Sequence, residues 1–505
     1  MFHEFVNFRR SGKSDNAGSA FKLPACSLYY PLSVLGRRSQ NPPGRRTLKT
    51  EATNYPAAPR SPFAVNNVRM FIAFRVFFNC RFYYPIFTVL FLDFGLTVAQ
   101  FSVLNAVWAA TIVAAEVPSG ALADIIGRRR LLVFAAFSML VEMAILCLAP
   151  RGNPTLLFGF FLVNRMLSGL AEAAASGADE AIAYDALQAE GLADQWGRVL
   201  DVQMRLRSVM FILTMSVGAA VYDPELMTRL MAAIGSGIRF TQDQTLRFPL
   251  YLTFILAVFT LAAVLRLDEV RPHAEADEAG RTTVGGSAWD AFKLTLATGQ
   301  WILRTPFVLA VILFGMLFDG ILRMVITLAS QYYRMVLLPE SLFGILGSVM
   351  AVAGLFIPRL AHRIAQRHSP AVCLWATSVV ALSGLTGMTF FWPYAGLIPA
   401  LLAFSALYMV GFYISYFINQ QASSAQRATV LSFKGLAYNL SYGLIGILYA
   451  TLLEVKKGGL DVAAGGVQAV ENIVFKETFF WFPLSLTAGL VAVTAAVLFF
   501  LKRRP

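Results

Sequence analysis

Charged side chains inside long apolar stretches are the residues of this chain whose chemistry is most informative. Arg165 and Glu172 lie seven residues apart in one such stretch, which places them two helical turns apart on one face. Gly169 lies between them and completes an Arg-x-x-x-Gly pattern. A guanidinium and a carboxylate on one cavity-facing stripe could exchange partners when a proton or a solute arrives. A static pair that only packs the helices is the alternative.

Other apolar stretches carry charges of the same kind. Arg81 lies in the middle of the first stretch, and both a cavity role and a packing role are open for it. Asp319 and Arg323 are four residues apart, so they can pair along one helix face. Glu142 has no partner close in sequence. Because charges inside a membrane are costly and usually face a bundle interior or an aqueous cavity, Arg81, Arg165, Gly169, Glu172, Asp319 and Arg323 are the candidate substrate or proton site.

The composition requires a membrane around these stretches. Of 505 residues, 57% are hydrophobic and 14% are charged, against about 45–50% and 25% in soluble domains. One soluble core cannot bury this surplus, because cores stop growing at about 250–300 residues. This excludes a soluble enzyme, a disordered chain and a disulfide scaffold. The four cysteines are scattered singly, so they indicate neither a disulfide framework nor a metal site.

Apolar stretches near the length of about 20 residues that crosses a bilayer follow one another after Met70. They predict an all-α polytopic membrane protein with spans at about 70–92, 99–122, 131–149, 155–180, 200–221, 248–265, 306–330, 341–358, 371–391, 394–418, 429–453 and 479–501. The expected parts are a basic, disordered tail (1–68), an N-terminal six-helix bundle (69–266), a cytoplasmic central loop (267–304) and a C-terminal six-helix bundle (305–505).

The distribution of Lys and Arg predicts the orientation. With the amino terminus inside, the inner connections and the end of the chain carry sixteen basic residues and the outer connections carry eight. Both termini are therefore expected in the cytoplasm, in a bacterial inner (plasma) membrane. Residues 1–60 hold ten basic and three acidic residues. A cytoplasmic tail, a start upstream of a functional Met70 and an organelle transit peptide are the alternatives for this segment.

The connection between the second and third predicted spans has a recognisable pattern. It reads Gly120-Ala-Leu-Ala-Asp124-Ile-Ile-Gly127-Arg128-Arg-Arg. This resembles the signature loop of the major facilitator superfamily, Gly-x-Leu-Ala-Asp-Arg-x-Gly-Arg-Arg, in sequence and in its place in a six-plus-six chain. Ile125 departs from the pattern, in which a basic residue usually follows the aspartate. The resemblance covers nearly everything after residue 69 and implies the fold of that family, with twelve transmembrane helices in two six-helix bundles.

The resemblance also implies a gate, in which this loop latches the two halves in the outward-open state. Gly120 would allow close helix packing, and Asp124 would face the positive amino end of a helix. Gly127 would permit a tight turn, and Arg128 would reach an acid on a neighbouring helix. Acids are disfavoured at a carboxyl-terminal helix end, so those that close the fourth span are the expected partners of Arg128: Asp179, Glu180 and Asp185.

The expected function is secondary active transport of a small solute by rocker-switch alternating access, coupled to protons by symport or antiport. No Walker loop, metal-ligand cluster or nucleophile elbow is visible, so we expect no enzyme activity and no cofactor. Several buried arginines suggest an organic anion as solute. A multidrug/proton antiporter and a non-transporting receptor or scaffold are the alternatives. Expected partners are the solute, protons and membrane lipids, without nucleic acid, and the chain is expected to be a monomer.

Overall fold

The computed structural model describes residues 61–269, 300, 302, 305–421, 424–458 and 467–502. The chain divides into the units Met1–Arg60 and Ser61–Pro505, and the structure described below is that of the second unit. The predicted tail up to residue 60 and nearly all of the predicted central loop lie outside the described residues.

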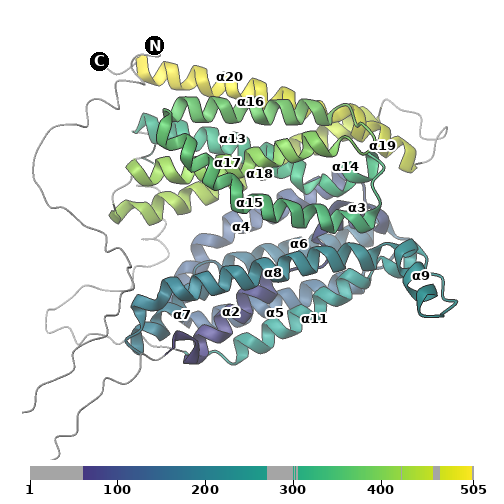
Figure 1. Cartoon of the computed structure of the whole chain (residues 1–505), viewed down its shortest axis with the longest axis horizontal. Coiled ribbons are helices and arrows are strands. Elements are labelled where there is room, and N and C mark those ends of the chain that lie inside the picture. Colours follow the sequence, from purple (N-terminus) through teal and green to yellow (C-terminus); the bar gives the residue numbers. More distant parts are fainter. Residues whose placement is uncertain are drawn as a thin grey trace, which may run out of the picture. The chain divides into compact units, whose positions relative to one another are not determined.

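Helices of the first bundle run between two ends of the unit (Figure 1). We name the end where α2 begins and α20 finishes the terminal face, and the opposite end the far face. The first bundle contains η1 (Pro62–Ala64), α2 (Asn66–Asn79), η2 (Tyr84–Ile86), α3 (Phe87–Phe94), α4 (Val98–Ile126), α5 (Arg128–Cys147), α6 (Pro154–Ala175), α7 (Ala178–Ala189), η3 (Ala193–Gln195), α8 (Trp196–Tyr222), α9 (Pro224–Ala233), α10 (Gln242–Thr245) and α11 (Phe248–Leu265).

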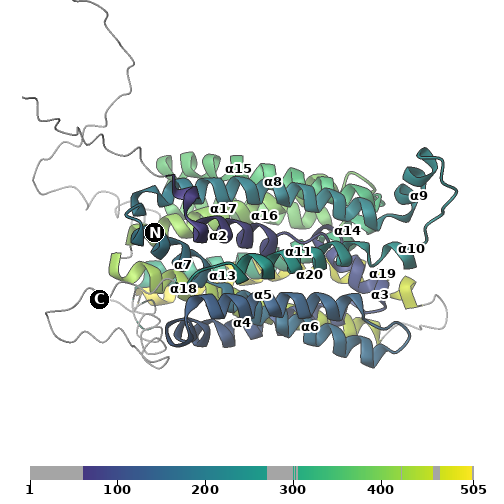
Figure 2. The ribbon, with the colours of Figure 1, turned by 90° about the horizontal axis from the view of Figure 1, so that it is seen from below.

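The second bundle repeats this arrangement with helices that also connect the two faces (Figure 2). Its elements are α13 (Pro306–Thr327), α14 (Ala329–Met335), η4 (Glu340–Leu342), α15 (Phe343–Arg367), α16 (Pro370–Met388), α17 (Leu397–Gln421), α18 (Ser424–Lys457), α19 (Val467–Thr478) and α20 (Trp481–Lys502). The predicted all-α fold with two six-helix bundles is confirmed.

The first predicted span, 70–92, differs from the expectation of one continuous helix. Eleven described helical stretches are long and apolar enough to cross a membrane, and the first span is not among them, because the chain leaves the helix between α2 and α3. Pro85 lies in this break, where its ring removes a backbone donor and disfavours helix at the preceding residue. The first span is therefore discontinuous, and Arg81 lies in the break.

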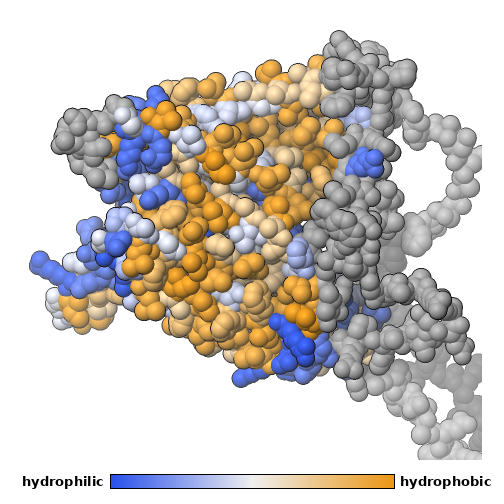
Figure 3. Space-filling view, turned by 180° about the vertical axis from the view of Figure 1, so that it is seen from behind, coloured by the Kyte–Doolittle hydropathy of each residue, from blue (hydrophilic) through white to orange (hydrophobic). Residues whose placement is uncertain are grey.

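Apolar side chains cover most of the side of the unit that Figure 3 shows, whereas hydrophilic residues gather toward its ends. Exposed large apolar residues include Phe137 of α5, Val209 of α8, Phe356 of α15 and Val491 of α20. An apolar surface of this extent suits hydrocarbon and not water. The unit is an integral, multi-pass membrane protein.

Two helix pairs join the bundles, α4 with α18 and α8 with α15. Glycines let these helices approach closely. A Cβ atom on Gly446 of α18 would lie 3.2 Å from the backbone oxygen of Ser102 in α4. A Cβ atom on Gly344 of α15 would overlap the backbone oxygen of Met215 in α8. The contact between the bundles is thus built on backbone packing as well as on side chains.

Candidate functional site

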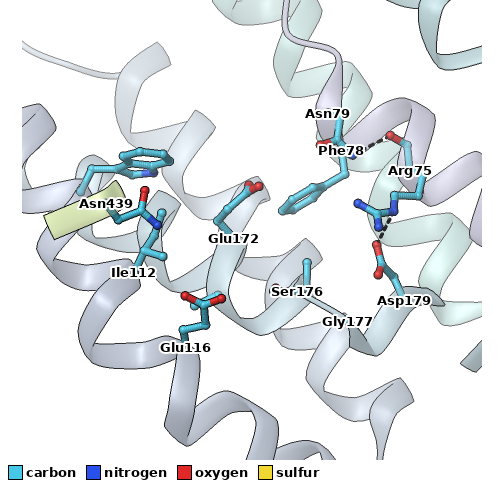
Figure 4. A pocket seen from close by; sticks show the side chains of 13 residues that line it. Arg75, Phe78, Asn79, Ile112, Glu116, Glu172, Ser176, Gly177, Asp179 and Asn439 are labelled. Carbon is cyan, nitrogen blue, oxygen red and sulfur yellow. Dashed lines mark hydrogen bonds and ion pairs between the residues drawn. The ribbon is translucent and has the colours of Figure 1, made fainter. Parts of the chain in front are cut away.

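A cavity of about 280 Å³ lies among α2, α4, α6, α7 and α18, so residues of both bundles line it. Its polar and aromatic lining includes Arg75, Phe78, Trp108, Glu116, Glu172 and Asn439. Figure 4 shows the carboxyl groups of Glu116 and Glu172 on this lining and Asn439 on the far side of the same space. This is a small, polar site that is partly open to solvent, and the exposed side chain of Glu172 is part of its lining.

The break in the first span places Arg81 deep in the first bundle. Its guanidinium forms an ion pair with Glu142 of α5 and donates a hydrogen bond of 3.0 Å to the Tyr83 hydroxyl. The exposed fractions of the Arg81 and Glu142 side chains are 4% and 0%. The two opposite charges neutralise each other at this depth, while the Nε atom of Arg81 and the Oε2 atom of Glu142 have no hydrogen-bond partner among the described residues. Glu142, which has no partner near in sequence, obtains one 61 residues away, in the break of the first span.

Arg165 and Glu172 of α6 do not form an ion pair with each other in the described structure. The Arg165 guanidinium lies 5.4 Å from the ring centre of Phe87 and 5.3 Å from that of Trp108, and it donates a hydrogen bond of 3.3 Å to Asn105. Glu172 faces the cavity. The two residues of the predicted stripe therefore have different surroundings: Arg165 contacts aromatic rings, and Glu172 lines the cavity.

Gly169, between these two residues, is where α6 and α4 meet. A Cβ atom at this position would lie 2.9 Å from the backbone oxygen of Trp108 and 2.9 Å from the Thr111 side chain. A residue larger than glycine would push the helices apart. Gly169 thereby fixes the distance between the two helices that carry Glu172 and Glu116.

The second bundle contributes a linked set of polar residues to the same region. Arg323 pairs with Asp319 and donates a hydrogen bond of 2.9 Å to Asn439, which lines the cavity. The Arg323 guanidinium also lies 5.3 Å from the ring centre of Tyr442. The ring of Tyr442 meets Trp108 of the first bundle edge to face, with centres 6.4 Å apart. Aromatic contact thus joins the bundles beside the cavity.

At the terminal face, the acids that end the fourth span divide between two arginines. Arg128 pairs with Asp185. Asp179 and Glu180 pair instead with Arg75 of α2, at 2.7 Å and 2.5 Å. Sequence analysis predicts Arg128 as the partner of all three acids. The packing of α2 against α7, which brings Arg75 to two of them, cannot be inferred from the spacing of residues along the chain.

Gly127 lies between α4 and α5 with a backbone φ of +93°, a conformation that residues with a Cβ atom rarely adopt. A Cβ atom there would also approach the carboxylate of Glu269. The turn that Gly127 was expected to permit is therefore present in the structure. The side chain of Asp124 and the surroundings of Gly120 lie outside the described part of the structure.

A cluster at the far face was missed by sequence analysis. Asp93 of α3 accepts two hydrogen bonds from Arg334 of α14, at 2.8 Å and 2.7 Å, and one from the Tyr222 hydroxyl. Arg334 also pairs with Glu340. Burial would lower the pKa of Arg334, but its hydrogen bonds to Asp93 and the two acidic charges hold that pKa above its usual value. The sequence feature that could have indicated this cluster is the opposite charge of Asp93 and Arg334 near the ends of the first and seventh spans.

Hydrogen bonds between described residues of different bundles lie in the half of the unit next to the far face. Ser330 of α14 accepts from the backbone nitrogens of Thr88 and Val89, at 3.0 Å and 3.1 Å. The backbone nitrogen of Ser341 donates to Asp223 at 3.3 Å. Ser216 and Ser348 lie 3.4 Å apart. Together with the Asp93–Arg334 pair, these contacts close the far face.

Comparison with known proteins agrees with this architecture. Residues 69–447 match the family model described as Major Facilitator Superfamily. No curated protein sequence matches the chain.

Three solved structures illustrate the likeness. A bacterial homologue of the human lysosomal transporter Spinster, inward-facing and unoccupied, has a TM-score of 0.64 and 15% identity over 89% of this chain and 99% of its own. The nucleoside transporter NupG has a TM-score of 0.58 and 14% identity over 85% and 99%. The inward-open xylose transporter XylE from E. coli has 0.54 and 13% over 88% and 97%. From the family match over three quarters of its length, this chain belongs to the major facilitator superfamily.

Proposed function

We propose that this chain is a secondary active transporter that moves a small solute by rocker-switch alternating access. The observation that carries the proposal is the position of the contacts between the bundles. The hydrogen bonds and the ion pair between the bundles, in the described residues, join α3 to α14 and α8 to α15 near the far face, whereas the cavity extends from Trp108 toward Asp179 on the terminal-face side. Two repeated bundles around a central site can rock so that such contacts break at one face and form at the other.

The terminal face is proposed to be cytoplasmic, because basic residues are concentrated in the connections and chain ends expected on that side. In that orientation the structure is the state open to the cytoplasm, and both termini lie inside. The segment with Gly120, Asp124, Gly127 and Arg128 would then close the cavity in the opposite state. Arg128 and Asp185 both belong to the first bundle, so their pair can persist through the movement and hold that segment in place.

We assign the proton site to Glu172. Its carboxyl group lines the cavity and has no ion-pair partner among the described residues. The side chain of Glu172 is exposed to the cavity, and an acid that faces a cavity from a membrane-spanning helix is a candidate proton site. The titratable and charged groups that face it are Glu116, Arg75, Arg81, Tyr84, Glu142 and Asp179. Two of these acids, Asp179 and Glu142, are already paired with Arg75 and Arg81.

A conformational measurement tests the proposal without knowledge of the solute. Spin labels on Leu148 and Leu337 report the distance between the bundles at the far face, and labels on Met204 and Leu360 report it at the terminal face. All four side chains are exposed. As the pH is lowered and Glu172 is protonated, we expect two populations, in which one distance grows while the other shrinks.

Controls separate proton binding from general effects of pH. Glu172→Gln should remove the pH dependence of the two populations. Glu225→Gln should leave it unchanged, because Glu225 is exposed on α9 and pairs only with Arg229 in the same helix. A single distance at each face under all conditions would instead support the non-transporting receptor or scaffold.

A further inference from the structure

We infer that the transported solute carries a positively charged amine, which binds to the carboxylates of Glu172 and Glu116 in the cavity. This inference rests on the proposed transport function and adds the chemical class of the solute. It is opposite in sign to the organic anion that the count of buried arginines suggested. The reason is the way in which those arginines are paired.

Three of the arginines near the cavity already have a carboxylate of the protein. Arg75 contacts Asp179 and Glu180, Arg81 contacts Glu142, and Arg323 contacts Asp319. An anionic solute would have to displace one of these acids and leave it buried without a partner, which is strongly unfavourable. These guanidinium groups therefore do not offer a free site to an anion.

Arg165 is the remaining buried guanidinium beside the site, and no carboxylate pairs with it among the described residues. It is 6% exposed and lies over the rings of Phe87 and Trp108. It does not belong to the cavity lining. The Trp108 side chain contacts this cation and also lines the cavity, so a solute meets the ring and not the guanidinium group itself.

The carboxylates of Glu116 and Glu172 are, by contrast, without an ion-pair partner among the described residues and line the cavity. They come from α4 and α6, which Gly169 holds in close contact. Figure 4 shows both groups on the same space as Phe78. A protonated amine would neutralise the carboxylates, and the rings of Phe78 and Trp108 would favour its charge or cover its apolar part. Two acids and two aromatic rings around one cavity match an organic monocation.

Asn439 of the cavity lining indicates a second feature of the solute. Asn439 comes from α18, and its side-chain oxygen already accepts a hydrogen bond from Arg323. Its amide nitrogen has two N–H donors, which can bind an acceptor on the solute. A solute with an amine at one end and an acceptor at the other would touch both bundles. The volume of about 280 Å³ is slightly below the usual range of drug-sized pockets, so the solute is small.

The test is a binding panel with the purified full-length chain. Each set of probes shares one skeleton and differs in its charge: hexylamine, hexanol and hexanoate; cyclohexylamine, cyclohexanol and cyclohexanecarboxylate; phenethylamine, phenethyl alcohol and hydrocinnamate. Thermal stabilisation and equilibrium dialysis are measured for each probe. We expect the amines to bind more tightly than the alcohols and the carboxylates not to bind.

Variants locate the site. Glu172→Gln should weaken amine binding about ten- to a hundredfold, because a hydrogen bond to a charged group is lost. Glu116→Gln should also weaken amine binding, and it provides the test if Glu172→Gln does not fold. Glu225→Gln on exposed α9 is the matched control and should bind amines normally. Binding of carboxylates or alcohols in preference to amines, or amine binding unchanged in both cavity variants, would overturn the inference.

The outcomes also separate this inference from the proposed function. If no amine binds but the bundles still move between two populations with pH, the solute class is wrong and the transport proposal stands. If amines bind through Glu172 but proteoliposomes show no counterflow of the bound amine, the cation site stands and transport is refuted.

Discussion

Replacing Asp93 with asparagine should open the far face. The side-chain oxygens of Asp93 accept two hydrogen bonds from Arg334 across the bundles, at 2.8 Å and 2.7 Å. Asparagine keeps the shape and one acceptor but removes the charge. Arg334 would keep Glu340, which lies in the same bundle, so the link between bundles is weakened while Arg334 retains an acidic partner.

The expected cost follows from the exposure of the pair. The side chains of Arg334 and Asp93 are 25% and 15% exposed, which places the pair between a surface ion pair, worth about 0–1 kcal/mol, and a buried one, whose disruption costs about 3–5 kcal/mol. We therefore expect the closed far face to lose about 2 kcal/mol. That difference raises the population of the state open at the far face about thirtyfold.

Cysteine labelling measures this population. Ser330 is 4% exposed and accepts hydrogen bonds from Thr88 and Val89 across the bundles. In a chain without native cysteines, Ser330→Cys should react with a membrane-impermeant maleimide only when the far face opens. Asp93→Asn in this background should raise the labelling rate by the same factor of about thirty. The exposed Glu225→Gln change is the control, and an equal rate with and without Asp93 would refute the reasoning.

Two further substitutions test the core of the first bundle. Glu142→Gln leaves the Arg81 guanidinium buried without its acid and should cost about 3–5 kcal/mol, seen as a large fall in melting temperature that replacing both residues with leucine partly restores. Gly218→Ala should lower the melting temperature by the equivalent of about 1–3 kcal/mol, because its Cβ atom would overlap the backbone oxygen of Phe82. Gly435→Ala, where a Cβ atom meets no atom within 4 Å, should leave it unchanged or slightly raised.

The helices and their grouping could be predicted because hydropathy is a local property. The break in the first span could not, although Pro85 gives a hint of it. Its backbone is covered by distant helices: the nitrogen of Phe82 donates a hydrogen bond of 3.0 Å to the Thr253 hydroxyl of α11, and Gly218 of α8 packs against the carbonyl group of Phe82. Irregular backbone at membrane depth is tolerated only when protein covers it in this way, and that cover is not visible in the apolar pattern of residues 70–92.

Ion pairs could likewise be predicted where the partners are close in sequence, but not where distant helices supply them. Asp319 and Arg323 are four residues apart in one helix and are paired in the structure, as local spacing predicts. Arg165 and Glu172 also share a helix face, but residues of other helices determine their contacts. Arg165 lies against the rings of Phe87 and Trp108, and Glu172 faces the cavity. Spacing along one helix limits which residues can meet but does not choose between competing partners from other helices.

The electrostatic character of the cavity depends on that choice. Arginines at positions such as 81 and 323 favour an anionic solute only if no carboxylate of the protein reaches them first. In this fold Glu142 and Asp319 reach them, so the guanidinium groups become part of the scaffold. The acids left over, Glu116 and Glu172, then set the charge that a solute meets. The same set of side chains therefore predicts solutes of opposite charge, according to whether charges are counted along the sequence or paired in the structure.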